Sequence, residues 1–226
     1  MAERVYLDTN VYCRPLDSQS DSRIHAESEA FLKIVDIAER EKIAVVSSDY
    51  VKFEIEQILD PPKRKDVRGF ERTLTTVNVA SSRRLVALAR EFSSRCNIGS
   101  LDALHVSAAC LGEACFLLTC DDEILDKAVC IEKLAAEEGY RLKVRNPINY
   151  LGKMESEKVT TSRIATVEVP FEALVKELGT KRAIEFISEI RKSYGDSVVE
   201  LRKTTEKLTI EQVEAEIKTL KKQGNI

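Results

Sequence analysis

Residues 5–10 are VYLDTN, a short apolar run that ends on a carboxylate and two further polar side chains. The apolar part predicts a buried strand that ends at Leu7, so Asp8 stands where the strand stops. In an open parallel sheet, ligands bind outside the carboxyl ends of the strands. Asp8 is therefore a candidate metal ligand, although Asp and Asn also often cap ordinary turns. The strand begins close to the N-terminus, so we expect no leader sequence before it.

The composition of the 226-residue chain is that of a globular protein with one domain and an appendage, or with two small domains. Its net charge of −3 gives no overall attraction for nucleic acid, so any such binding depends on a local patch. No apolar run approaches the roughly 20 residues of a membrane span, and we expect a cytoplasmic protein without membrane contact.

The cysteines and histidines do not form a zinc motif. Six cysteines and two histidines are present, and no two cysteines form a C-x-x-C pair. Because no secretory segment is visible, the pattern also argues against a disulfide framework. We expect the cysteines to be mostly small buried apolar residues in a reducing cytosol.

Strand and helix patterns alternate along the first 150 residues. Apolar runs predict strands at 43–46, 76–79, 114–119 and 142–144. Apolar residues at helical spacing predict helices at 22–40, from 51 to the two prolines at 61–62, from 100 to 111, and at 131–138. The alternation predicts a three-layer α/β domain over residues 1–150, with a mostly parallel central sheet flanked by helices.

Four acids fall where such a sheet gathers them. Asp8 and Asp121 follow strands, and Glu54 borders the apolar stripe of its helix. Asp102 lies in the first turn of the helix that Ser100 is expected to cap, where the helix dipole stabilises a carboxylate. Crowded carboxylates repel and take up protons unless cations neutralise them. Oxygen-rich clusters suit Mg²⁺ or Mn²⁺, and two such ions can clamp an in-line phosphoryl displacement.

Neighbouring acids leave the exact ligand set open. Asp122 directly follows Asp121, and both are candidate metal ligands, with Asp121 favoured by its spacing from the preceding strand. Glu56 competes with Glu54 but lies further toward solvent on the predicted helix. His105 is expected to be a packed residue that supports the site rather than a metal ligand.

Four motifs occur in the order seen in PIN-domain nucleases. They are VYLDTN at 5–10, Ser48 with Glu54 six residues later, SLDALH at 100–105 and LTCD at 118–121. The chain most resembles the VapC-type toxins of that family, from residue 3 to about residue 148. A minimal toxin of this kind lacks the tail that follows here.

The resemblance implies a parallel sheet flanked by helices and metal-dependent cleavage of single-stranded or structured RNA. It implies that Asp8, Glu54, Asp102 and Asp121 hold Mg²⁺ or Mn²⁺. The side chains that it implies as supports for the acids or for bound water are Thr9, Asn10, Ser48 and Thr119. It also implies a homodimer or higher oligomer, and it leaves open an antitoxin-like inhibitor.

Residues 63–95 form the basic part of the chain, with nine cations and three anions. A charge run of this kind is often only a solvated helix face. The alternative is a rim that contacts phosphates and fixes the register of a nucleic acid without reading its sequence. The candidate RNA-binding residues are Lys63, Arg64, Arg68, Arg83 and Arg84.

Residues 151–226 differ in pattern from the first domain. A linker is expected at 152–162, a strand at 163–169, and helices at 171–178, 180–194 and 209–222. The strand-helix-helix order resembles ribbon-helix-helix DNA-binding antitoxins. Because amphipathic helices of this length are unstable alone, we expect this extension to pack against the first domain or against a second copy of the chain.

The sequence therefore predicts a metal-dependent endoribonuclease that hydrolyses RNA by a two-metal-ion mechanism, toxin-like or engaged in RNA processing. Two alternatives stay open: a catalytically inactive RNA-binding or scaffold module, and a nuclease domain fused to a DNA-binding, antitoxin-like tail. The chain has neither a glycine-rich phosphate loop nor a G-x-S-x-G motif, which argues against a nucleotide-triphosphate-binding protein and against a serine hydrolase.

Overall fold

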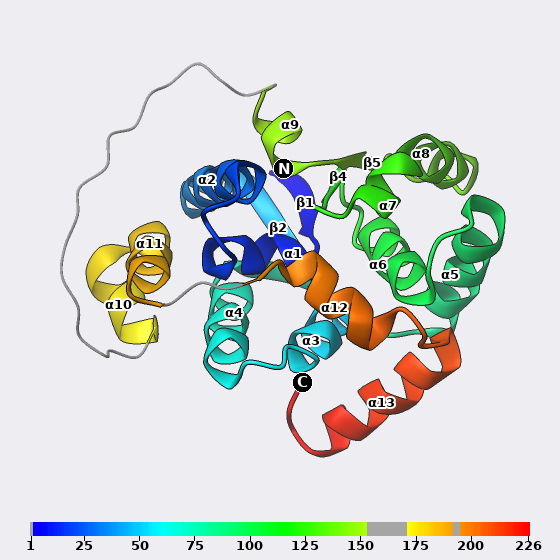
Figure 1. Cartoon of the computed structure of the whole chain (residues 1–226). Helices are drawn as coiled ribbons and strands as arrows, with labels where there is room; N and C mark the ends of the chain where they lie inside the picture. The colour runs from blue at the N-terminus through cyan, green and yellow to red at the C-terminus, as the bar shows by residue number, and fades with distance from the viewer. Residues whose placement is uncertain (1, 153–170, 192–194) are drawn as a thin grey trace.

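The computed structural model describes residues 2–152, 171–191 and 195–226. The strand expected at 163–169 and nearly all of the expected linker lie outside the described residues. Within them, one five-stranded sheet forms the centre of the protein, with helices on either side (Figure 1).

The strands are all parallel and follow the order β3-β2-β1-β4-β5. Their bounds are Glu3–Leu7 for β1, Ile43–Ser48 for β2, Thr75–Val79 for β3, Phe116–Leu118 for β4 and Lys143–Arg145 for β5. The expected α/β architecture is confirmed. Since β1 pairs with β2 on one side and with β4 on the other, the strand order reverses at β1, which is where open parallel sheets bind ligands.

The central strands are apolar because both faces of the sheet are covered. Val5, Tyr6 and Leu7 of β1 are fully buried, as continuous apolar runs in parallel sheets usually are. Helix α2 packs against β2, while α6 packs against both β2 and β4. In Figure 1, the sheet lies between α2 on one side and α5 with α6 on the other.

The helices of the first 152 residues connect these strands. They are α1 (Thr9–Cys13), η1 (Arg14–Leu16), α2 (Ser22–Glu39), α3 (Asp49–Glu56), α4 (Pro61–Leu74), α5 (Arg83–Cys96), α6 (Ser100–Leu111), α7 (Asp122–Asp126), α8 (Ala128–Glu137) and α9 (Pro147–Leu151). The expectation that Ser100 caps α6 is wrong by one residue. Gly99 is the N-cap, and Ser100 is the first helical residue.

One disulfide corrects the expectation for the cysteines. Cys96 at the end of α5 is bonded to Cys130 in α8, with their Cα atoms 5.7 Å apart. The sequence did not predict this pair because the two residues are 34 positions apart and meet only through the packing of α5 on α8. The expectation of buried free cysteines holds for Cys13, Cys110 and Cys120.

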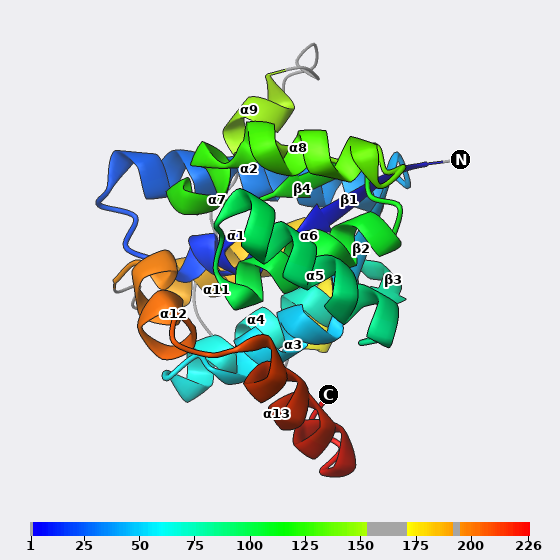
Figure 2. The ribbon, with the colours of Figure 1, turned by 90° about the vertical axis from the view of Figure 1, so that its right-hand side faces the viewer.

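The described part of the C-terminal region, residues 171–191 and 195–226, forms four further helices that wrap around the first domain (Figures 1 and 2). They are α10 (Phe171–Leu178), α11 (Thr180–Ile190), α12 (Ser197–Thr205) and α13 (Ile210–Lys222). The sequence did not predict α12. Helix α11 ends at Ile190, and residues 192–194 of its expected range lie outside the described residues. Helix α11 packs on α2 and α4, α12 packs on α1, and α13 packs on α3 and α6. Packing of the extension on the first domain is therefore confirmed.

None of the helices in the described ranges is both long and apolar enough to span a membrane.

Candidate active site

The reversal of strand order brings the ends of β1 and β4 together. Asp8 directly follows β1, and its backbone N–H donates to the carbonyl of Leu118, the last residue of β4, at 3.0 Å. Asp121 follows the same strand three residues later. Because β1 and β4 are parallel neighbours, Asp8 and Asp121 lie at the same edge of the sheet.

The carboxylate of Asp8 is held by three donors. Thr9 donates its backbone N–H to Oδ1 at 2.8 Å, Asn10 donates Nδ2 to Oδ2 at 2.6 Å, and the Thr119 hydroxyl donates to Oδ2 at 2.7 Å. The Thr119 hydroxyl also accepts the backbone N–H of Asp121 at 3.0 Å. Asn10 and Thr119 therefore fix the orientation of Asp8, whereas Thr9 does so only through its backbone.

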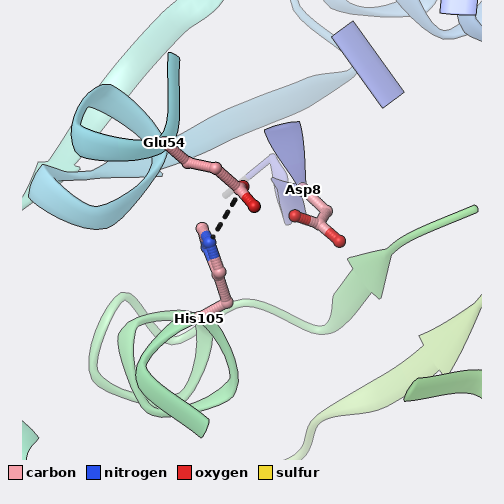
Figure 3. Close-up of side chains that lie close together, drawn as sticks. All are labelled: Asp8, Glu54 and His105. Carbon is pink, nitrogen blue, oxygen red and sulfur yellow. Dashed lines mark ion pairs between the residues drawn. The ribbon is translucent and has the colours of Figure 1, made fainter. Parts of the chain in front are cut away.

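Glu54 and His105 face Asp8 across the site (Figure 3). One carboxylate oxygen of each acid and one ring nitrogen of His105 all lie within 4.8 Å of one another. Nε2 of His105 is 3.3 Å from Oε2 of Glu54, close enough for an ion pair. Neither of these two buried atoms has a hydrogen bond of acceptable geometry within the described residues.

Tyr6 links this cluster to the start of α3. Its hydroxyl is 2.8 Å from Nδ1 of His105 and 2.7 Å from the hydroxyl of Ser48. Ser48 is the N-cap of α3 and accepts the backbone N–H groups of Tyr50 and Val51. Ser48 therefore fixes the first turn of the helix that carries Glu54. The sequence analysis did not single out Tyr6, because a tyrosine inside an apolar strand is ordinarily a core residue.

The environment of the acids changes their protonation. Burial raises the pKa of Asp8 to about 6, and the neighbouring Glu54 carboxylate adds to this rise. Burial also raises the pKa of Asp102, in the first turn of α6, to about 7, with Asp121 and Asp8 contributing. Although burial lowers the pKa of His105, Glu54 and Asp8 raise it to about 8. Asp8 and Asp102 are therefore buried acids that also lie within the electrostatic influence of neighbouring carboxylates.

The structure separates the two pairs of competing acids. Asp121 is 5% exposed and influences Asp8 and Asp102 electrostatically. Asp122 is exposed, and both of its oxygens accept from the Arg23 guanidinium at 2.7 Å. Likewise Glu54 is buried beside Asp8, whereas Glu56 forms an ion pair with Arg68.

Arg202 on α12 is a further site residue that the sequence analysis missed. Its Nε donates to Oδ2 of Asp121 at 2.8 Å, and its Nη2 donates to Oδ1 at 2.5 Å. Its Nη1 pairs with Glu123 at 2.5 Å. No local sequence signal marks this arginine, since α12 was not predicted and Asp121 is 81 positions away.

The five basic candidates occupy different environments. Lys63 is buried in an ion pair with Asp17 at 2.9 Å, so its ammonium already has an internal partner. Arg64 is partly buried and donates to the carbonyl of Glu56, and Arg68 pairs with the side chain of the same glutamate. Arg83 and Arg84 are exposed at the start of α5.

The donor set suits a hard divalent cation. Buried carboxylate oxygens converge with a histidine nitrogen, and one oxygen and the nitrogen have no hydrogen-bond partner among the described residues. Oxygen-rich sites of this kind prefer Mg²⁺ or Mn²⁺, and a single nitrogen ligand is compatible with Mn²⁺.

The fold and the cluster together define an α/β domain with an acidic site at the switch point of its sheet. The family model described as PIN domain matches residues 5–130, which is more than half of the chain. The chain therefore belongs to the PIN-domain family, and PIN domains are generally nucleases. Comparison with curated proteins gave no match, and comparison with solved structures gave none either.

Proposed function

We propose that this protein is a divalent-metal-dependent endoribonuclease that hydrolyses RNA phosphodiester bonds through two metal ions. The observation that carries the proposal is the buried cluster of Asp8, Glu54 and His105, whose ligand atoms lie within 4.8 Å of one another. Asp102 and Asp121 join the proposal through their sequence motifs and because Asp121 acts electrostatically on Asp8 and Asp102. Burial first, and neighbouring carboxylates second, raise the pKa values of Asp8 and Asp102, so keeping these acids ionised lowers the stability of the fold. A purely structural module has no need of such an arrangement.

The ligands in this proposal are the four acids, with Mg²⁺ or Mn²⁺ as the ion. When bound, the ions supply an acidified water and positive charge at the scissile phosphate. Asp8 presents a carboxylate whose orientation is fixed by Asn10 and Thr119. His105 and Tyr6 hold the Glu54 side of the site in place through their contacts. The chemistry then needs no nucleophilic side chain.

The substrate side of the proposal depends on the surface around these acids. Arg83 and Arg84 are exposed and remain candidates for phosphate contacts, together with Arg64 and Arg68. Lys63 is the weakest of the five candidates because its ammonium is buried on Asp17. The VapC-like toxin role, the homodimer or higher oligomer and the antitoxin-like inhibitor all remain part of the proposal, on the sequence resemblance.

The test is cleavage of labelled RNA by the full chain in Mg²⁺, in Mn²⁺ and in EDTA. We expect metal-dependent cleavage that leaves a 5′-phosphate and a 3′-hydroxyl. Asp8→Asn keeps the shape of the side chain and removes one charge, so it should lower the rate by on the order of a hundredfold or more, as lost preorganised electrostatics do.

Asp122→Asn is the matched control, because it removes one neighbouring charge that Arg23 holds outside the cluster. Its rate should stay within about threefold of the unsubstituted chain, since exposed ion pairs contribute little. Cleavage that persists in EDTA, or that is indifferent to Asp8→Asn, refutes the nuclease assignment.

A further inference from the structure

Helix α12 lies against α1 (Figure 1). Its Arg202 reaches Asp121 at the end of the sheet where the acids lie. All three nitrogens of the Arg202 guanidinium are engaged there, two by Asp121 and one by Glu123. The Arg202 side chain is 23% exposed and that of Asp121 is 7% exposed, so the pair is largely removed from water.

We propose that α12 is a built-in competitor for the metal site. Arg202 occupies Asp121 in place of a divalent cation, and the chain thereby closes its own acid cluster. The consequence for RNA cleavage rests on the proposed function above, whereas the competition for Asp121 does not.

The first argument is that Arg202 and a metal ion compete for the same carboxylate. Both oxygens of Asp121 accept hydrogen bonds from Arg202, and Oδ1 also accepts the backbone N–H of Glu123 at 2.9 Å. Both lone pairs of Oδ1 are therefore in use, and one lone pair of Oδ2 is left. Bidentate arginine-carboxylate pairs are among the strong, geometrically specific contacts in proteins. A fixed guanidinium charge at this point also repels an incoming cation. A metal ion at Asp121 therefore has to compete with Arg202 for this carboxylate.

The second argument is that specific polar contacts fix the start of α12 on the first domain; we call this contact surface the seat of α12. Asp17 is fully buried and accepts both the backbone N–H of Ser197, at 3.1 Å, and its hydroxyl, at 2.6 Å. Asp196 pairs with Arg14 at 2.7 Å. These contacts lie at the start of α12, and they orient the helix so that Arg202, five residues after Ser197, meets Asp121.

The third argument is that the seat is mostly polar. Among the described residues of α12, Leu201 is buried at 5% exposure, Val198 is half-buried against the core, and Val199 is 49% exposed. Interfaces of this polar kind resemble transient contacts more than a hydrophobic core. The neighbouring helices are attached separately, α11 through Arg191 on Asp66 and α13 through Lys221 on Asp49. Helix α12 can thus leave the acids while the rest of the extension stays bound.

The experiment compares Arg202→Ala with Lys203→Ala in the full chain. Lys203 is the next residue of the same helix and is exposed, so its substitution removes the same charge without touching the acids. Mn²⁺ affinity is measured by calorimetry, and RNA cleavage is measured at subsaturating Mn²⁺. We expect Arg202→Ala to bind Mn²⁺ at least about tenfold more tightly, because the closed state no longer lowers the apparent affinity. The cleavage rate should rise with it, and Lys203→Ala should change neither by more than about twofold.

The outcomes separate this proposal from the proposed function. Tighter Mn²⁺ binding with no RNA cleavage by any form supports the competition and removes the ribonuclease assignment. Unchanged or weaker Mn²⁺ binding by folded Arg202→Ala overturns the competition. Tighter Mn²⁺ binding with slower RNA cleavage also refutes the proposal that Arg202 closes the site. In that case Arg202 contributes to binding or cleavage of the substrate.

Two further variants cover the case in which Arg202→Ala does not fold. Arg202→Lys keeps the charge but loses the planar fork. Ser197→Ala loosens the seat on Asp17 without touching the acids. Each should tighten Mn²⁺ binding by a smaller factor than Arg202→Ala, and unchanged affinity in both overturns the proposal.

Discussion

Asp102→Asn should make the metal-free protein more stable at neutral and alkaline pH. Burial and the neighbouring acids raise the pKa of Asp102 from 3.8 to about 7 on folding. Below pH 4 the Asp102 carboxyl is mostly protonated in both the folded and the unfolded state. It therefore has little effect on the free energy of unfolding there. As the pH rises toward 7, the unfolded chain ionises first, and folding loses free energy. Asparagine keeps the shape and cannot ionise, so it removes this loss.

The magnitude follows from the same pKa. Each pKa unit corresponds to about 1.4 kcal/mol, which gives an upper bound of about 4 kcal/mol above pH 7. Asp102 is partly exposed and titrates together with Asp8, so we expect about half of that bound, ~2 kcal/mol. For a chain of this size, such a gain corresponds to a rise in melting temperature of about 4 to 8 °C.

The assay is thermal unfolding of both proteins from pH 4 to pH 8.5, in EDTA and in Mn²⁺. In EDTA the curves should coincide near pH 4 and diverge as the pH rises. Mn²⁺ should reverse the order, because a ligand that binds only the folded state stabilises it, by about 2.7 kcal/mol at a hundred times its dissociation constant. Asp102→Asn should lose most of this gain.

Asp122→Asn provides the control of opposite sign. The hydrogen bond from Arg23 lowers the pKa of Asp122, so its small stabilising effect is present above pH 4 and is lost as the pH falls. This variant should be slightly less stable than the parent at pH 8. If Asp102→Asn is no more stable than the parent at pH 8 in EDTA, neither burial nor the neighbouring carboxylates raise the pKa of Asp102, and its place among the buried acids is refuted.

Three further changes test other parts of the structure. Cys96→Ser opens a bridge between residues 34 positions apart, and chain entropy gives a loss of about 3 to 4 kcal/mol, seen as a lower melting temperature in non-reducing buffer. Reduction of the parent should reproduce that loss, and an unchanged melting temperature would exclude the bridge. Arg83→Ala with Arg84→Ala should weaken RNA binding and lower the slope of log affinity against log salt by about 1 to 2, whereas an unchanged slope makes them a solvated face. Glu54→Gln should lower the cleavage rate about a hundredfold or more, and Glu56→Gln should leave it within about threefold; the reverse order would move the helix acid to Glu56.

The local pattern of the sequence is sufficient for the sheet and for most of its acids. An apolar run that ends at Leu7 and another that ends at Leu118 are buried strands, and each is followed by an acid of the cluster. The physical reason is that parallel strands bury both faces and point their carboxyl ends to one edge. The pattern of apolar residues along the sequence is therefore enough to predict where Asp8 and Asp121 lie in the sheet. Their contacts are not needed for this prediction.

Only the tertiary structure distinguishes between two candidate acids that lie close together in the sequence. Asp121 and Asp122 are adjacent in an equally polar stretch, and only the position of Arg23 on α2 draws Asp122 away from the cluster. In the same way, Arg68 on α4 pairs with Glu56, while His105 on α6 lies against Glu54. These partners come from distant helices, so no spacing along the chain encodes them.

The contact of Arg202 with Asp121 depended entirely on tertiary structure. Helix α12 is short, and Leu201 is its buried leucine. Such a segment has little tendency to be helical without the surface on which it packs. Its first turn is held by Asp17, which lies 180 residues earlier in the chain. The sequence determined where the acids gather, and the packing of the extension determined that an arginine lies upon them.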